Sequence, residues 1–166
     1  MKAKHILYSI LLTLPLLFSC QEDDINEIFV SGTWNVGNFY NGGDWNKYDN
    51  DGGRAKYTKE EDKRALNALT ITFQEDGTLQ GRLANNATLT GRWQANGDKR
   101  TISITYLKTS NSVTDKSKEL VEALENAAYY KGDKNYLKLA PATKNSYVQL
   151  GHYPPIRQEF DYGNEQ

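Results

Sequence analysis

Aromatic side chains gather in and beside the stretch from Asn38 to Gly53, which is also rich in Asn, Asp and Gly. This stretch is too long for a simple turn, and long loops on a rigid scaffold are where binding sites are usually built. Rings beside carboxylates and amides can stack on a glycan or close over a small apolar molecule. The sequence therefore predicts a ligand-binding site made of Trp45, Tyr48, Asp49, Asp51 and Tyr57. The alternative is that these rings are core residues that cap one end of the fold.

Residues suited to catalysis or metal binding are sparse. After position 20 the chain has one histidine, His152, and no cysteine, so neither a conventional triad nor a histidine-rich metal site can be assembled. The run from Asp49 to Gly53 resembles part of a calcium loop, but its fifth position is glycine rather than Asp or Asn. A polar turn explains this run better. We therefore predict no enzyme activity, no metal and no cofactor.

The first twenty residues indicate export. Lys2 and Lys4 form a basic head, and an apolar run follows over residues 6–18. A helix across a bilayer core of about 30 Å needs roughly 20 apolar residues, so this shorter run is typical of a signal peptide. The segment from Leu17 to Cys20 resembles the bacterial lipobox, in which the cysteine becomes the diacylated first residue of a lipoprotein. The alternative is an ordinary secretory signal with a cysteine near its end by chance.

Cys20 is the only cysteine in the chain, so it has no partner for an intramolecular disulfide and is best explained as an acyl acceptor. The acidic run over residues 21–24 resembles the surface-export tag of Bacteroidetes lipoproteins. We expect a lipid-anchored outer-membrane protein. This acidic run favours display on the cell surface, and the leaflet that the protein faces is left open. Its contact with the membrane would then be through acyl chains on Cys20 and not through a transmembrane element.

Length and charge limit the classes of partner. Removal of residues 1–19 from the 166 leaves 147, a length that suits one domain with a sizeable core. Loss of Lys2 and Lys4 leaves 18 basic against 21 acidic residues. The densest stretch of lysine and arginine, from Lys56 to Arg64, is interleaved with Glu60, Glu61 and Asp62, so the sequence argues against nucleic acid as a partner.

Alternating apolar and polar residues predict strands along most of the chain. Leu69, Ile71 and Phe73 share one face of a strand, and the Asp76-Gly77 pair predicts a hairpin turn after it. Further predicted strands lie at the Trp34 segment and in ranges 78–83, 89–93, 102–106, 127–131, 136–140 and 146–150. On the 102–106 strand, Ile102, Ile104 and Tyr106 are expected to face inward.

Two helical patterns interrupt the strands. Thr58 and Glu61 have the spacing of a capping box, which predicts a short early helix over 58–67. Leu120, Val121 and Leu124 recur at helical spacing and predict a late amphipathic helix over 115–127. The expected fold is mostly β, an antiparallel meander of about eight strands that closes into a lipocalin-like barrel and so leaves no exposed edges.

The motifs Gly32-Thr33-Trp34, Ile71 to Gly77 and Gly91-Arg92-Trp93 resemble the start of lipocalin-like and META (HslJ-like) domains of bacterial envelope lipoproteins. The helix from Lys118 to Leu124 and the segments that follow it are similar to the closing helix and hairpin of META domains. META domains usually carry Gly-Cys-Asn where this chain has residues 85–88, so a lipocalin-like relative of unknown function fits better. The resemblance implies a barrel and brings no catalytic residues.

These observations divide the chain into four parts: a signal peptide at 1–19, a lipidated acidic tether at 20–30, a lipocalin-like barrel at 31–152 and a tail at 153–166. The predicted function is that of a non-catalytic envelope lipoprotein that binds a small apolar molecule or a glycan. The alternative is a protein-interaction or envelope-maintenance module whose barrel is packed solid by Trp34, Phe73, Trp93 and leucines. The oligomeric state is left open.

Overall fold

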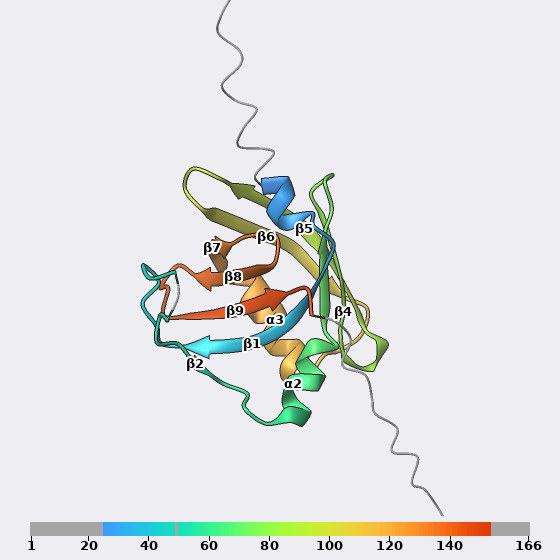
Figure 1. Cartoon of the computed structure of the whole chain (residues 1–166). Coiled ribbons are helices and arrows are strands. Elements are labelled where there is room, and N and C mark those ends of the chain that lie inside the picture. Colours follow the sequence, from blue (N-terminus) through green and yellow to red (C-terminus); the bar gives the residue numbers. More distant parts are fainter. Residues whose placement is uncertain (1–24, 49, 154–166) are drawn as a thin grey trace, which may run out of the picture.

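The computed structural model describes residues 25–48 and 50–153. Within these residues an antiparallel sheet runs as a meander, and pairing of β1 with both β3 and β9 closes eight strands into a barrel (Figure 1). The predicted eight-stranded antiparallel barrel is confirmed. Its strands are β1 (Thr33–Asn41), β3 (Thr70–Phe73), β4 (Thr78–Arg82), β5 (Thr88–Asn96), β6 (Thr101–Thr109), β7 (Ala127–Gly132), β8 (Tyr136–Pro141) and β9 (Ser146–Gly151).

Strand β1 has two partners on one edge. Its first residues pair with β3, from Thr33 to Asn35, and its last two pair with the two-residue strand β2 (Arg54–Ala55). Residues 42–53 therefore form a loop whose two ends are fixed side by side. We call this segment the 42–53 loop.

One hairpin turn has the predicted geometry and another differs from it. Gly77 has φ +77°, and the Asp76 carboxylate accepts hydrogen bonds from the Thr78 backbone N–H and hydroxyl, as expected for an Asp-Gly turn. In the β5–β6 turn the left-handed conformation falls on Arg100, with φ +50°, instead of on the predicted Asn-Gly pair. The Asn96 side chain accepts from the Lys99 backbone N–H and so brings Lys99 and Arg100 to the tip of this turn.

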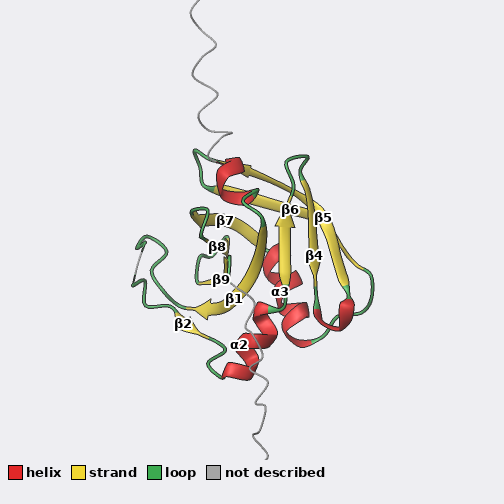
Figure 2. Ribbon diagram, turned by 45° about the vertical axis from the view of Figure 1, so that its right-hand side comes forward, coloured by secondary structure: helices red, strands yellow, loops and turns green. Residues whose placement is uncertain are grey.

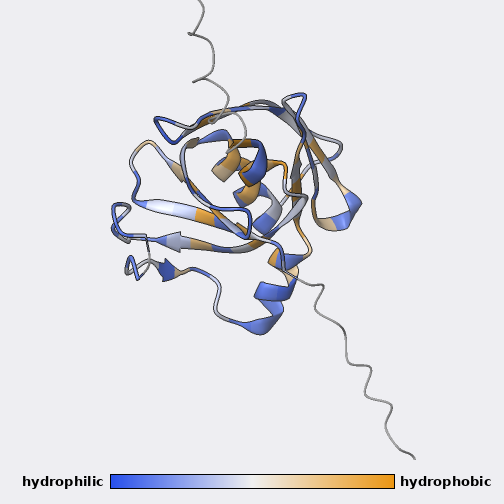
Figure 3. Cartoon of the chain, turned by 45° about the horizontal axis from the view of Figure 1, so that its top comes forward, coloured by the Kyte–Doolittle hydropathy of each residue, from blue (hydrophilic) through white to orange (hydrophobic). Residues whose placement is uncertain are grey.

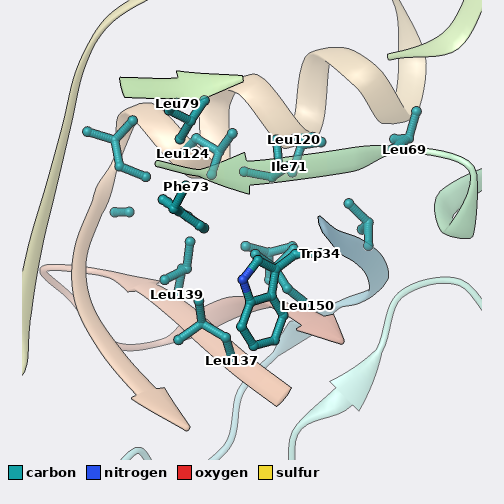
Figure 4. Close-up of a cluster of buried hydrophobic side chains, with 14 of the residues drawn as sticks. Trp34, Leu69, Ile71, Phe73, Leu79, Leu120, Leu124, Leu137, Leu139 and Leu150 are labelled. Carbon is teal, nitrogen blue, oxygen red and sulfur yellow. The ribbon is translucent and has the colours of Figure 1, made fainter. Parts of the chain in front are cut away.

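Side chains fill the barrel interior. Trp34, Ile71 and Phe73 are at most 1% exposed, and Leu120 and Leu124 of helix α3 (Asp115–Glu125) are fully buried against them (Figure 4). Hydrophobic residues lie toward the middle of the molecule, whereas hydrophilic residues dominate the loops at its periphery (Figure 3). Trp34, Phe73 and Trp93 are all buried, as the packed barrel of the alternative function requires.

The N-terminal segment closes the end of the barrel opposite α2 (Glu60–Asn67) and α3 (Figure 2). Residues 25–29 are helical, and the fully buried Phe29 ring contacts the rings of Phe73, Trp93 and Tyr130 at centroid distances of 4.9 to 5.1 Å. The Trp34 indole N–H also donates to the Phe29 carbonyl at 3.0 Å. The domain boundary predicted at Ser31 therefore leaves two core residues, Ile28 and Phe29, in the tether.

Both predicted helices form, with shifted ends. The early helix, predicted over 58–67, is α2 (Glu60–Asn67), and the late one, predicted over 115–127, is α3. Lys59 occupies the N-cap of α2 and no side chain caps the helix, so the capping box predicted from Thr58 is wrong. The three acidic residues of the first turn still complement the helix dipole.

Tyr106 does not face inward as predicted. Pairing between β5 and β6 shifts register at this point, and Tyr106 takes φ +54° with its side chain 80% exposed. The extra residue reverses the alternation, so Leu107 turns inward over Gly91. Glycine suits this close approach, because a Cβ on residue 91 would lie 2.7 Å from a Leu107 methyl carbon and the Leu107 side chain would have to shift.

The join between β6 and β7 is the thinnest in the barrel. A single residue pair, Thr101 with Tyr129, connects the two strands, next to a hydrogen bond from the Tyr130 N–H to the Arg100 carbonyl at 3.0 Å. Helix α3 lies between these strands in the chain and packs against β6, β8 and β9.

Among the described residues, no helix is both long and apolar enough to cross a bilayer. The predicted signal peptide at 1–19 and Cys20 lie outside the described residues, as does the predicted tail apart from Tyr153.

Replacement of Phe29 by alanine is expected to lower the free energy of unfolding by about 3 to 5 kcal/mol, because a fully buried ring that touches three others is removed. Urea denaturation followed by tryptophan fluorescence measures this change. Glu27→Ala, at an exposed position two residues earlier, is the control and should leave the midpoint unchanged. Equal midpoints for Phe29→Ala and the unmodified protein would show that Phe29 is not part of the core.

Candidate functional site

The 42–53 loop is attached to the outward face of the barrel by Asp51. Lys138 lies between the core residues Leu137 and Leu139 on β8, so its side chain points outward, where its ammonium group contacts the Asp51 carboxylate at 2.9 Å. Both side chains are only 10% exposed. Asp51 also accepts from the Gly53 backbone N–H at 2.8 Å and from the Tyr147 hydroxyl at 3.2 Å.

These contacts fix the charge on Asp51. Burial by itself would raise its pKa, but hydrogen bonds from Lys138, Gly53 and Tyr147 outweigh burial and hold the pKa below the ordinary value of 3.8. The pKa of Tyr147 is raised by burial and by its hydrogen bond to Asp51. The stabilisation from Asp51 is thus fully present above the ordinary pKa of a carboxyl group and is lost only as the pH falls through the lowered value.

Aromatic rings line the outside of the barrel beneath the loop. Tyr40 and Tyr147 stack across the β1–β9 pair, with centroids 4.8 Å apart and an interplanar angle of 14°. Trp45 lies 6.3 Å from Tyr147, and Tyr48 meets Tyr136 edge to face at 6.0 Å. The loop therefore lies against the outer face of β8 and β9. The core alternative fails for Trp45 and Tyr48, whereas Tyr57 packs against the core as that alternative expected.

A second attachment joins the loop to β7. The Lys131 ammonium group donates to the backbone carbonyls of Trp45 and Lys47, and it lies 5.0 Å from the centroid of the Trp45 ring. Burial lowers the pKa of Lys131, with a further contribution from the like charge of Lys138. The loop and β7 thus form two walls held at a fixed separation.

An open cleft of about 520 Å³ lies between these walls. Its volume falls within the range of small-molecule sites. Four aromatic residues line it, Trp45, Tyr48, Tyr129 and Tyr130, together with four cations, Lys99, Arg100, Lys131 and Lys144. Asn46 and Gly132 complete the lining.

The five predicted site residues separate in the structure. Trp45 and Tyr48 line the cleft, whereas Asp51 is used to attach the loop. Asp49 lies outside the described residues. Tyr57 lies elsewhere, where its hydroxyl donates to Glu119 on α3 at 2.8 Å, and burial together with this bond raises its pKa to about 12.

The four cations of the cleft were not predicted as site residues. They come from the β5–β6 turn, from β7 and from the β8–β9 turn, so no stretch of the sequence brings them together. Only the closure of the barrel places these turns beside the 42–53 loop. Within the described residues there is also no group of three or more His, Cys, Asp or Glu side chains that could hold a metal ion.

Replacement of Asp51 by Asn is expected to destabilise the protein by about 3 kcal/mol, because Lys138 is left buried without a counter-charge. The loop should also detach from the barrel, so trypsin should cleave after the exposed Lys47 faster than in the unmodified protein. Asp44→Asn makes the same change at an exposed position of the same loop and should alter neither measurement. Equal cleavage rates for the two variants would contradict this role of Asp51.

Comparison with known proteins supplies the family. The family described as "Domain of unknown function (DUF4847)" matches residues 20–152. The crystal structure of a DUF4847 family protein from Bacteroides vulgatus ATCC 8482 is 35% identical, with a TM-score of 0.65 over 78% of this chain and 97% of that one. The NMR structure of a protein from Burkholderia xenovorans is 12% identical, with a TM-score of 0.52 over 75% of this chain and 83% of that one. No curated protein matches.

The second likeness concerns the fold alone, because its identity is so low. The family match spans the described barrel from its N-terminal segment to His152. The resemblance to META domains stays a prediction. The chain belongs to the DUF4847 family, whose domain has no assigned function.

Proposed function

We propose that this protein is a non-catalytic module that binds a small ligand, and that the cleft between the 42–53 loop and β7 is its binding site. The observation that carries this proposal is the combination of aromatic and polar lining in a cleft of about 520 Å³. Small-molecule sites usually combine apolar surface with a few polar groups that set orientation. Trp45 and Tyr48 supply the first, and Asn46 with the cations supplies the second.

The packed interior favours a glycan over an apolar molecule. Phe29 closes one end of the barrel and the α3 leucines pack at the other, so the inner face is occupied by the protein's own side chains. An apolar ligand of the kind held inside open barrels would have to displace them. A ligand bound on the outside meets rings next to charged and amide groups, which suits a sugar.

A second candidate is the protein-interaction or envelope-maintenance module. The observation in its favour is Tyr106, a large side chain that is 80% exposed at a bulge with φ +54°. Exposed aromatic residues are common anchors in protein interfaces. Tyr106 is not among the residues that line the cleft, so the two functions can be tested separately.

We also propose that the protein is anchored to the outer membrane by acyl chains on Cys20 and is exposed at the cell surface. Support comes from the lipobox-like segment before Cys20 and the acidic residues after it. The 35% identical family member from Bacteroides vulgatus fits the Bacteroidetes-type signal. The helical segment at residues 25–29 leaves four residues, 21–24, between the anchor and the described domain, a short tether.

Native mass spectrometry of the protein purified from its own cells is expected to show a bound small molecule. Tyr48→Ala should reduce the bound fraction at least about fivefold, because it removes a half-exposed ring from the cleft wall without opening the core. Tyr106→Ala removes an equally large exposed ring outside the cleft and should leave the bound fraction unchanged. Absence of any bound molecule, or equal losses in both variants, would refute the binding proposal.

Cys20→Ser is expected to move the protein from the membrane fraction to the soluble fraction, since serine cannot accept the thioether-linked diacylglycerol. Cell fractionation and metabolic labelling with a palmitate analogue measure the change. Ser19→Ala, one position earlier, keeps a small residue before the cysteine and should retain label and membrane attachment. If the protein with Cys20 in place took up no palmitate label, the proposal of an acyl anchor would be excluded.

A further inference from the structure

We infer that the ligand of the cleft is negatively charged, a carboxylated or sulfated saccharide. This inference rests on the proposed binding function and specifies its ligand class. It is based on the charge, pairing and placement of Lys99, Arg100, Lys131 and Lys144.

The cleft carries positive charge, whereas the chain as a whole has no excess of basic residues. The full sequence has 20 basic and 21 acidic residues, so the residues other than these four are 16 basic against 21 acidic. In the described structure, no Asp or Glu is among the residues that line the cleft. Four positive charges around about 520 Å³ produce a local field that attracts an anion.

These four cations have no acidic partner. Throughout the described part of the chain, none of them forms a salt bridge with Asp or Glu, whereas Lys56, Lys116 and Lys138 each contact a carboxylate within 2.9 Å. A bound anion would supply the missing counter-charge.

Aromatic rings keep the cations at the cleft without neutralising them. The Lys144 ammonium lies 3.8 Å from the centroid of the Tyr129 ring, and the Arg100 guanidinium carbon lies 5.4 Å from that of Tyr130. Cation–π contact of this kind orients a charge and leaves its N–H groups free to donate. The side chains are therefore positioned for charge-assisted hydrogen bonds to carboxylate or sulfate oxygens.

The environment of Lys131 gives a further reason to expect a negatively charged ligand. Its pKa is lowered first by burial and then by the like charge of Lys138, with a smaller effect from Lys144, while Asp51 and Asp44 act in the opposite sense. The charged form of Lys131 is thus less stable than that of a lysine in water. An anion in the cleft would favour the charged form of Lys131 and oppose this lowering of its pKa.

The size and lining of the cleft favour a saccharide over a small inorganic anion. A sulfate or phosphate ion fills only a small part of about 520 Å³ and leaves Trp45 and Tyr48 uncovered. A sugar that carries acidic groups presents ring faces to the aromatic residues and charges to the cations. The same chemistry is provided by uronic acids and by sulfated sugars, and the experiment separates them.

Isothermal titration calorimetry of the full chain against trigalacturonate, a sulfated heparin disaccharide and neutral maltotriose tests the inference. At least one acidic probe is expected to bind about tenfold or more tightly than maltotriose, and the difference should shrink as salt is added. The acidic probe that binds identifies carboxylate or sulfate as the recognised group. Equal affinity for maltotriose and both acidic probes, or no binding of either acidic probe, would overturn the inference.

Charge variants test the location. The double variant Lys99→Gln/Lys144→Gln should weaken binding of the acidic probe at least about tenfold, because two charge-assisted contacts are lost. Lys59→Gln/Lys118→Gln removes the same charge from exposed positions on and beside the helices and should change the affinity less than twofold. Equal weakening by both double variants would show that the affinity depends on net charge alone, and would exclude the cleft as the binding site.

The outcomes separate this inference from the binding proposal. A neutral molecule found on the native protein and lost in Tyr48→Ala would support the binding site and overturn its anionic specificity. No molecule on the native protein, together with no binding of any probe, would overturn both.

Discussion

Strand β1 pairs with β9 along one edge and with β3 and then β2 along the other. This double pairing closes the barrel and also holds the two ends of the 42–53 loop together. The loop can therefore be long without being loose, because its closure is enforced by strands that the rest of the fold requires. The wall of the cleft that the loop forms depends on this arrangement.

A barrel whose interior is filled leaves only its outer surface for the proposed ligand. Phe29 and the α3 leucines occupy the space in which a wider barrel would hold a ligand. Outward-facing residues of β7 to β9 then become available, and the buried pair of Asp51 and Lys138 attaches the loop across them. Such a pair contributes little net stability once its desolvation is counted, but it permits only one position of the loop. The main effect of the Asp51–Lys138 pair is thus to fix the shape of the cleft wall that the loop forms.

The period-two pattern was sufficient to predict the strands, the meander and the closure, because one face of each strand is buried and the alternation is strong. It failed at Tyr106, where a bulge inserts one residue and no local signal marks it. Phe29 was assigned to the tether because its partners lie more than forty residues away in sequence. The apolar run that contains it was the only available sign.

The residues of the candidate site likewise fall into those that the sequence could predict and those that it could not. Trp45 and Tyr48 could be proposed because they lie together in one loop, and they do line the cleft. Lys99, Lys131 and Lys144 lie in separate turns and strands that only the tertiary fold brings together. This cleft also crosses the thin β6–β7 join, with Arg100 on one side and Tyr129 on the other. A ligand that spans it would act as a removable cross-link in place of the missing ladder of hydrogen bonds, so occupancy and the mechanical integrity of the barrel would rise and fall together.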